Sequence, residues 1–344
     1  MRHWLLFLAA CCGLAGAISA RTPAPVNDAA ILDGTPRMLS EFRFFFRPRS
    51  QSSHSAIPYE LRTPLYSDGA DKLRFAYIPA GEQAIADGDG LLQFPVGSAL
   101  IKTFAFGEGP DRRLIETRVL LHREAGWVAL PYIWNDEQTD ARLALAGGRI
   151  ALTRPDGAEI SYRIPNKNQC KQCHVKDGAV IPIGPKARNL SAEWLEQAVE
   201  WNRLDQVPDV ERRIPNWQTV TDHHAEADEA SGGADIDAFA RGYLDVNCAH
   251  CHMPGGSASN SGLDLRWEQD DPVAYGVHKP PVAAGRGAGG LLVSIEPGAP
   301  ERSILFHRMA STEPGVAMPE LGKSTVDDIG LEVIRTWISA METQ

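Results

Sequence analysis

Two copies of a Cys-x-x-Cys-His pentapeptide constrain this 344-residue chain more than any other feature of its sequence. They are Cys170-Lys171-Gln172-Cys173-His174 and Cys248-Ala249-His250-Cys251-His252. Two thiols one helical turn apart can each form a thioether with a haem vinyl group, and the adjacent histidine can then bind the iron. The pattern predicts two covalently bound haem c groups, with cofactor-binding cysteines at Cys170, Cys173, Cys248 and Cys251 and iron ligands at His174 and His252.

Three other uses of cysteine pairs compete with haem attachment. Structural disulfides give no reason for a histidine directly after both pairs. Zinc-ribbon knuckles usually lie closer together than the 74 residues that separate Cys173 from Cys248. A thioredoxin-like redox pair requires a surrounding βαβ pattern, which the sequence lacks. Haem attachment explains both the spacing and the histidines.

The N-terminus is typical of an export signal. Arg2 and His3 precede an apolar run from Trp4 to Ile18, and small residues up to Ala20 offer a cleavage site. We therefore expect residues 1–20 to be a signal peptide and the mature protein to lie in the periplasm. The alternative is a membrane-anchored lipoprotein, since Leu8-Ala9-Ala10-Cys11 resembles a lipoprotein cleavage box that would leave a lipid anchor at Cys11. No later segment is long and apolar enough to predict a transmembrane span.

Charge helps to define the class of partner. The chain has 34 Lys and Arg against 44 Asp and Glu, a formal net charge of -10, without long runs of one sign. This balance argues against nucleic acid as a partner. The expected partners are periplasmic or membrane-bound electron donor and acceptor proteins.

Hydrophobic periodicity divides the chain into three zones. Short alternating or apolar runs predict strands between residues 60 and 163, at Leu73–Ile78, Leu91–Phe94, Ala99–Phe106, Leu114–His122, Trp127–Trp134 and Arg149–Leu152. In the fourth run, Ile115, Thr117, Val119 and Leu121 are expected on one face, with Glu116 and Arg118 on the other. Helical spacing follows from about residue 164, with helix starts predicted at Ser191, at Asp235 and at a capping box of Ser324 and Asp327.

These zones predict an α+β multidomain chain. We expect an N-terminal all-β, sandwich-like domain followed by two mainly helical cytochrome c-type modules. The expected divisions are a signal peptide (1–20), a β-rich domain with an N-terminal extension (21–163), a first haem module (164–234) and a second haem module (235–344).

The second module contains a candidate for the ligand opposite His252. Met318 follows His252 by 66 residues and stands just before the last predicted helix, where a thioether can approach the iron from the other side. Met253 is too close to His252 to cross the haem plane. Met309 falls on the apolar side of a short helix and is a better candidate for the core.

The first module has no methionine between His174 and Cys248. The second ligand of its iron is therefore open. The candidates are an oxygen or lysine ligand, or one of His223, His224, Met38, His54 and His122, the last three from the β-rich zone. The remaining alternative is an iron with an open position. A backbone carbonyl in the turn 181–185 is expected to accept the Nδ1 proton of His174. Arg188 and Arg266 are candidates to balance haem propionates, and His250 is interpreted as a surface residue.

Several stretches resemble a family of poorly characterised bacterial di-haem c-type cytochromes. The resemblance is carried by Tyr243–His252, Pro254–Gly256, Ser261–Arg266, Arg308–Met309 and Met318–Gly322, and by the earlier stretches Thr63–Asp68, Phe94–Gly97, Trp134–Thr139, Ile164–Asn166 and Pro185–Arg188. It covers most of the mature chain and implies haem binding and electron transfer, but no substrate.

Two functions remain in view. The first is a periplasmic electron carrier with both irons six-coordinate. The alternative is a di-haem, peroxidase-like oxidoreductase in which haem 1, the haem bound by His174, is the substrate site. No acid and base constellation near residues 170–190 requires catalysis, so electron transfer is favoured and no catalytic residue is assigned.

Overall fold

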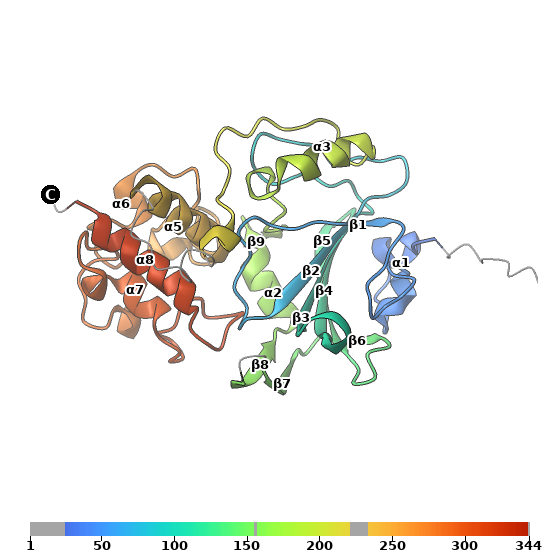
Figure 1. The fold of residues 1–344 in the computed structure, drawn as a ribbon, viewed down its shortest axis with the longest axis horizontal. Helices are drawn as coiled ribbons and strands as arrows, with labels where there is room; N and C mark the ends of the chain where they lie inside the picture. The colour runs from blue at the N-terminus through green and yellow to red at the C-terminus, as the bar shows by residue number, and fades with distance from the viewer. Residues whose placement is uncertain (1–24, 155–156, 221–232, 343–344) are drawn as a thin grey trace, which may run out of the picture.

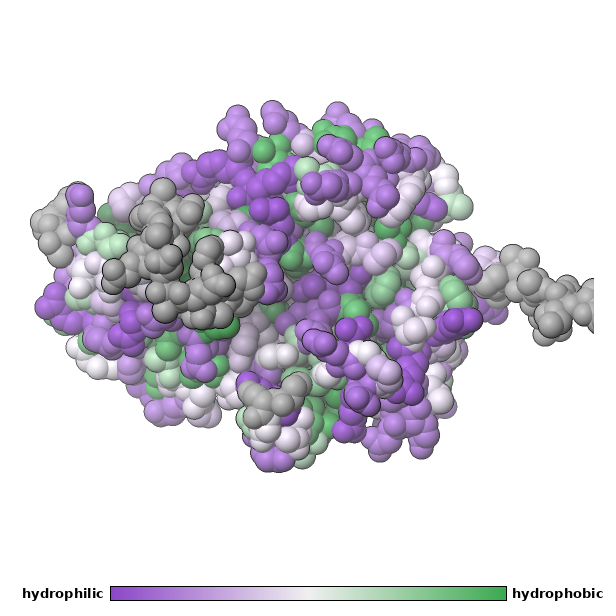
Figure 2. All heavy atoms as spheres, viewed as in Figure 1, coloured by the Kyte–Doolittle hydropathy of each residue, from purple (hydrophilic) through white to green (hydrophobic). Residues whose placement is uncertain are grey.

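The computed structural model describes residues 25–154, 157–220 and 233–342. The predicted signal peptide, Cys11, His223 and His224 lie outside these residues. Within them, no helix is both long and apolar enough to cross a membrane. Hydrophilic residues are spread over the face shown in Figure 2, where hydrophobic residues form only scattered small areas.

A six-stranded antiparallel sheet forms the centre of the molecule (Figure 1). Its strands lie in sequence order, so each pairs with its neighbour along the chain. They are β1 (Ala56–Pro58), β2 (Asp71–Tyr77), β3 (Ala99–Phe106), β4 (Arg113–Arg123), β5 (Gly126–Trp134) and β6 (Ala141–Leu143). β3 has the predicted bounds, and β2, β4 and β5 differ from the prediction by one or two residues at their ends.

The predicted sandwich is wrong, because the described residues contain one large sheet and two separate hairpins. One hairpin pairs β7 (Gly148–Thr153) with β8 (Glu159–Ile164), and the other pairs β9 (Val175–Lys176) with β10 (Ala179–Val180). The run Leu91–Phe94 forms isolated bridges instead of a strand.

Both faces of the large sheet are covered. On one face, α1 (Asp28–Leu32) and nearby residues such as Phe42 pack over Ile101 and Val119. On the other, α2 (Lys167–His174) packs against β5, and Figure 1 shows α1 and α2 on opposite sides of the sheet. A register shift after Phe104 moves Ile115 away from the face predicted for it and into a cluster with Tyr162.

The prediction of a separate helical first module is also wrong. α2 lies on the sheet, and α3 (Ala192–Glu200) shares a buried cluster with sheet residues such as Leu100. Local signals still set the helix starts: Asn166 and Gln169 form a capping box at α2, and the Ser191 hydroxyl caps α3. Apolar residues on both sides of the proposed module boundary bury each other, so the segment has no core of its own.

The C-terminal region is not a mainly helical module either. Its long helices are α5 (Gly233–Asn247) and α8 (Asp328–Ala340), which pack together, whereas α6 (Pro272–Tyr275) and α7 (Ile304–Met309) are short and joined by loops. Asp327 alone caps α8 through its bond to Gly330 N (3.1 Å). Ser324 N donates to Asp68 Oδ1 (2.6 Å), so the predicted capping box is replaced by a contact with the β-rich part of the chain.

Candidate haem sites

The second pentapeptide and the predicted distal methionine meet in one cavity. Cys248, Cys251, His252 and Met318 line about 1500 Å³ of empty space, part of it open to solvent. Apolar side chains such as Leu265 complete the wall. The structure thus brings together all four residues predicted for the second haem.

Backbone contacts hold Met318 at this cavity. Its N–H donates to the carbonyl of Arg308 (2.9 Å), and Arg308 Nε donates to the carbonyl of Val316 (2.8 Å). Met309 also reaches the cavity wall but is 5% exposed and belongs to the core under α8. Met253 is not among the residues that line the cavity.

A serine orients His252. Ser261 Oγ donates to the carbonyl of Ala258 (2.7 Å), and its other side lies 2.9 Å from His252 Nδ1. The hydroxyl hydrogen is already used, so Nδ1 carries the proton and Nε2 keeps its lone pair for a metal. Burial lowers the pKa of His252, which favours the neutral imidazole that binds iron.

His174 is oriented in the same way at a second cavity, which holds about 960 Å³ of empty space between α2 and the sheet. Its Nδ1 lies 2.8 Å from the carbonyl of Ile181. A carbonyl only accepts, so Nδ1 donates and Nε2 is free. This is the bond expected in the turn 181–185. Burial lowers the pKa of His174 to about 3, so its ring is neutral at physiological pH.

The sheet side of this cavity is basic. Arg74, Lys102 and Arg118 line it together with Cys170 and His174. Burial and the neighbouring Arg118 and Arg74 together lower the pKa of Lys102 to about 7.

Beside them, the fully buried Glu116 carboxylate holds Arg118 through two bonds of 2.8 and 2.5 Å and accepts a bond from Tyr162 Oη (2.8 Å). Glu116 and Arg118 therefore lie on the predicted face of β4, but that face is buried under α2 and β8.

The methionine and histidines considered in the β-rich zone do not reach the cavity of His174. Met38 pairs with Arg142 at the far edge of the sheet. His54 stacks on Phe46 with ring centroids 4.3 Å apart. His122 stacks on Trp127 and bonds to a backbone carbonyl. None of these three residues is therefore placed to bind an iron held by His174.

The first pentapeptide lies between the two cavities. Cys170 and His174 face the cavity beside the sheet, whereas Cys173 lines the cavity of the second pentapeptide. The ligand atoms of Cys173, His250 and Cys251 all lie within 4.8 Å of one another. The interpretation of His250 as a surface residue is wrong, because its Nδ1 is buried and has no hydrogen-bond partner among the described residues.

A backbone contact supports this meeting of the two motifs. Asp177 N, in the β9–β10 turn, donates to the carbonyl of Gly255 (3.0 Å). Gly255 has φ +77°, and a Cβ there would lie 2.2 Å from Asp177 Oδ1, so only glycine fits. The contact joins two motifs that are far apart along the chain, so no local sequence signal predicts it. The Asp177-Gly178 pair is a recognisable hairpin turn, but its partner is not readable from one sequence.

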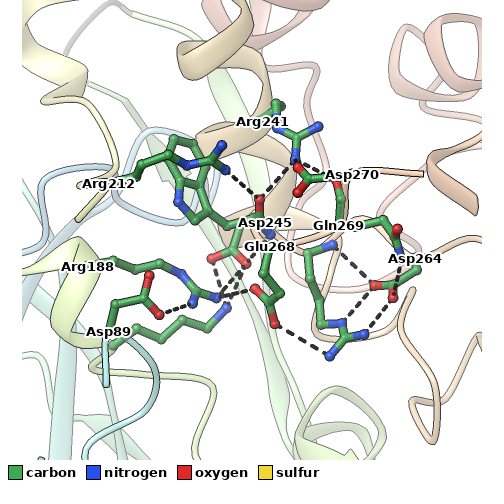
Figure 3. A network of polar contacts seen from close by, with 12 residues as sticks. Asp89, Arg188, Arg212, Arg241, Asp245, Asp264, Glu268, Gln269 and Asp270 are labelled. Carbon is green, nitrogen blue, oxygen red and sulfur yellow. Dashed lines mark hydrogen bonds and ion pairs between the residues drawn. The ribbon is translucent and has the colours of Figure 1, made fainter. Parts of the chain in front are cut away.

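Arg188 belongs to a network of ion pairs near the sheet-side cavity (Figure 3), and Arg266 joins this network through Glu268 at 3.4 Å. Arg188, which is 4% exposed, contacts Asp89, Asp245 and Glu268 at 3.0, 3.2 and 2.9 Å. Arg266 contacts Asp264 at 2.6 Å. Carboxylates of the chain already neutralise both guanidinium groups, so the structure does not support their assignment to haem propionates.

The donors present fit covalent haem. Each pentapeptide places a neutral imidazole with a free Nε2 at a largely apolar cavity, and the second cavity adds a thioether. His250 Nδ1, which is buried and has no hydrogen-bond partner among the described residues, is also consistent with a polar or metal-containing group at this place. Comparison with protein-family models, curated proteins and solved structures finds no match.

Proposed function

We propose that the protein is an exported di-haem c-type cytochrome that carries electrons between redox partner proteins. Cys170 and Cys173 would hold one haem and Cys248 and Cys251 the other, with His174 and His252 as iron ligands and Met318 as the second ligand beside His252. Each haem supplies a site that takes up and releases one electron. The expected compartment is the periplasm, and the alternative is a lipoprotein anchored to a membrane through Cys11.

The observation that carries this proposal is the position of Cys173 beside Cys251 within 4.8 Å. Two groups attached to these sulfurs would meet at the boundary between the cavities. Electron tunnelling weakens steeply with distance, so close attachment points favour transfer inside one chain. A protein that only bound two unrelated haems would have no need for this contact.

Met318 and His252 would tune the second site. A thioether ligand favours ferrous iron and raises the reduction potential of a c-type haem. The Ser261 hydroxyl oxygen accepts a hydrogen bond from His252 Nδ1–H, which makes the imidazole a stronger electron donor to the iron.

A bare metal site is the second candidate, because Cys173, His250 and Cys251 could hold a soft or borderline cation such as zinc. Zinc binding by Cys173 and Cys251 excludes haem attachment at these two residues, since a thioether sulfur is no longer a thiolate. It also leaves Cys170, Cys248 and both iron-ligand histidines without a role.

Denaturing mass spectrometry of protein matured with haem-attachment machinery separates the candidates. The wild type should carry two haems, and the double variants C170A/C173A and C248A/C251A should each carry one. Q172A changes a non-ligand position of the first pentapeptide and should keep both. A mature chain with no covalent haem that retains zinc would overturn the proposal.

Fractionation of the native host tests localisation. The protein should be recovered outside the cytoplasm, and release that requires detergent, with Cys11 as the first residue, would establish a lipid anchor. Uncleaved protein in the cytosol would contradict export.

A further inference from the structure

We propose that Lys102 is the second axial ligand of the iron bound by His174. This inference rests on the proposed attachment of haem at Cys170 and Cys173. It assigns to the first site a nitrogen ligand that comes from the sheet, far from the pentapeptide in sequence.

The two side chains come from opposite walls of one cavity. His174 ends α2, which packs against β5, whereas Lys102 lies in the middle of β3. Lys102 is on the same face of the sheet as Leu100, and both line the cavity with Cys170 and His174. An iron held from the helix side by His174 would therefore present its other axial position to the sheet.

The other polar side chains that line this cavity are engaged or unsuitable. Arg74 and Arg118 stay protonated in proteins and offer no lone pair. Lys186 Nζ donates to both Asp245 oxygens at 2.9 and 2.8 Å, which engages both residues. The remaining competitors are Asn189, whose amide bonds to the backbone of Thr63 through both its oxygen and its nitrogen, and the phenol of Tyr59.

Tyr59 is the closest rival, but its phenol would have to ionise to bind iron strongly. Burial raises the pKa of Tyr59 to about 12, which opposes this ionisation, and the variant Tyr59→Phe tests the phenol directly.

Lys102 is half-buried and forms no ion pair with a carboxylate among the described residues. Its Nζ lies 5.3 Å from the ring centroid of Phe104, and its cross-strand neighbours are Arg74 and Arg118. The nearby Glu116 carboxylate is bound through both oxygens by Arg118. An ammonium group in this setting lacks the ion pair that buried lysines usually have, whereas an amine can donate its lone pair.

Binding of Lys102 to the iron would change the charge and protonation of the side chain but not its oxidation state. The Lys102 ammonium releases one proton to solvent, the nitrogen lone pair forms the bond to iron, and no electron is transferred. With this position filled, the first iron has no open site for substrate, which favours the carrier over the peroxidase-like enzyme.

The test compares the full-length wild type with Lys102→Leu, which leaves a shorter, apolar side chain at this position and removes the donor nitrogen. Tyr59→Phe removes the rival phenol, and Lys72→Leu changes another half-buried lysine of the sheet that does not line the cavity. Denaturing mass spectrometry should find two haems in every variant, which keeps a failure of ligation distinct from a failure of haem attachment.

The expected result is a change at one iron only. Electron paramagnetic resonance of the ferric protein should show two low-spin irons in the wild type and one low-spin and one high-spin iron in Lys102→Leu. Carbon monoxide binding to the reduced variant should rise to one fast site per chain. The two control variants should match the wild type.

Retention of the wild-type spectrum by Lys102→Leu with both haems attached would overturn the assignment, as would a high-spin iron in Tyr59→Phe. The double variant H223A/H224A should keep both irons low-spin, and a change there would also overturn it. If Lys102→Leu does not accumulate, nuclear magnetic resonance of the reduced wild type with labelled lysine decides: a liganding side chain gives strongly shifted methylene signals, and their absence refutes the proposal.

Discussion

Replacement of Asp245 by asparagine should destabilise the protein more than any other single change in its ion-pair network. The Asp245 carboxylate is fully buried and accepts bonds from Lys186 Nζ, Arg188 Nη2 (3.2 Å) and Trp267 N (3.1 Å). It joins α5 to the segment beside the sheet-side cavity. Asparagine keeps the shape but leaves two cations without their shared negative charge.

The magnitude follows from burial. Removing one partner of a buried ion pair typically costs about 3–5 kcal/mol. Arg188 keeps Asp89 and Glu268, so we expect a loss near the lower limit, about 3 kcal/mol, which is roughly a 100-fold increase in the unfolding constant. Glu268→Gln is the matched control: its carboxylate is 48% exposed and contacts the same Arg188, so it should cost less than about 1 kcal/mol.

The difference between wild type and Asp245→Asn should also depend on pH. Burial opposes ionisation of Asp245, but Lys186 and Arg188 outweigh it and lower the pKa of this carboxyl in the folded state. The stabilisation is therefore fully present above the unfolded pKa of about 3.9 and is lost as the pH falls through the lower folded value.

Urea unfolding of the haem-loaded protein, followed by far-ultraviolet circular dichroism at pH 7 and pH 3, measures both effects. A cost below about 1 kcal/mol at pH 7, or an equal cost for Glu268→Gln, would refute the reasoning.

Three further predictions concern the C-terminal region. Met318→His should lower the reduction potential of the second haem and abolish any sulfur-to-iron absorption, whereas Met309→Leu should change neither. A redox titration in which Met318→His matches the wild type would show that Met318 is not a ligand. Ser261→Ala should raise the same potential, because His252 loses the acceptor that increases its basicity, and an unchanged potential would show that the serine does not tune the site. Gly330→Ala should destabilise the protein by about 1–3 kcal/mol in urea unfolding, because the added Cβ would lie 2.4 Å from the Tyr243 ring. Alanine is the better helix former, so a stabilised variant would contradict the tight packing of α5 on α8.

The strands of the sheet were predictable where apolar residues extend over a long run. β3, β4 and β5 follow the predicted runs closely because each buries both of its faces. The short strands β1 and β6 were missed, since three residues are too few to show a period. The helical-module prediction failed because a helical pattern reports which face is apolar but not what covers it: α2 packs on the sheet.

The sequence by itself determined the chemistry that the chain can offer: two thiol pairs with adjacent histidines, a methionine before the last helix, and local caps such as Ser191. These signals act over a few residues and need no distant partner. Only the tertiary structure decided which groups meet, placing Cys173 beside Cys251 and Lys102 on the wall opposite His174. Such contacts depend on how buried surfaces far apart in the chain pack against each other, and the local periodicity of the sequence does not predict which surfaces will pair.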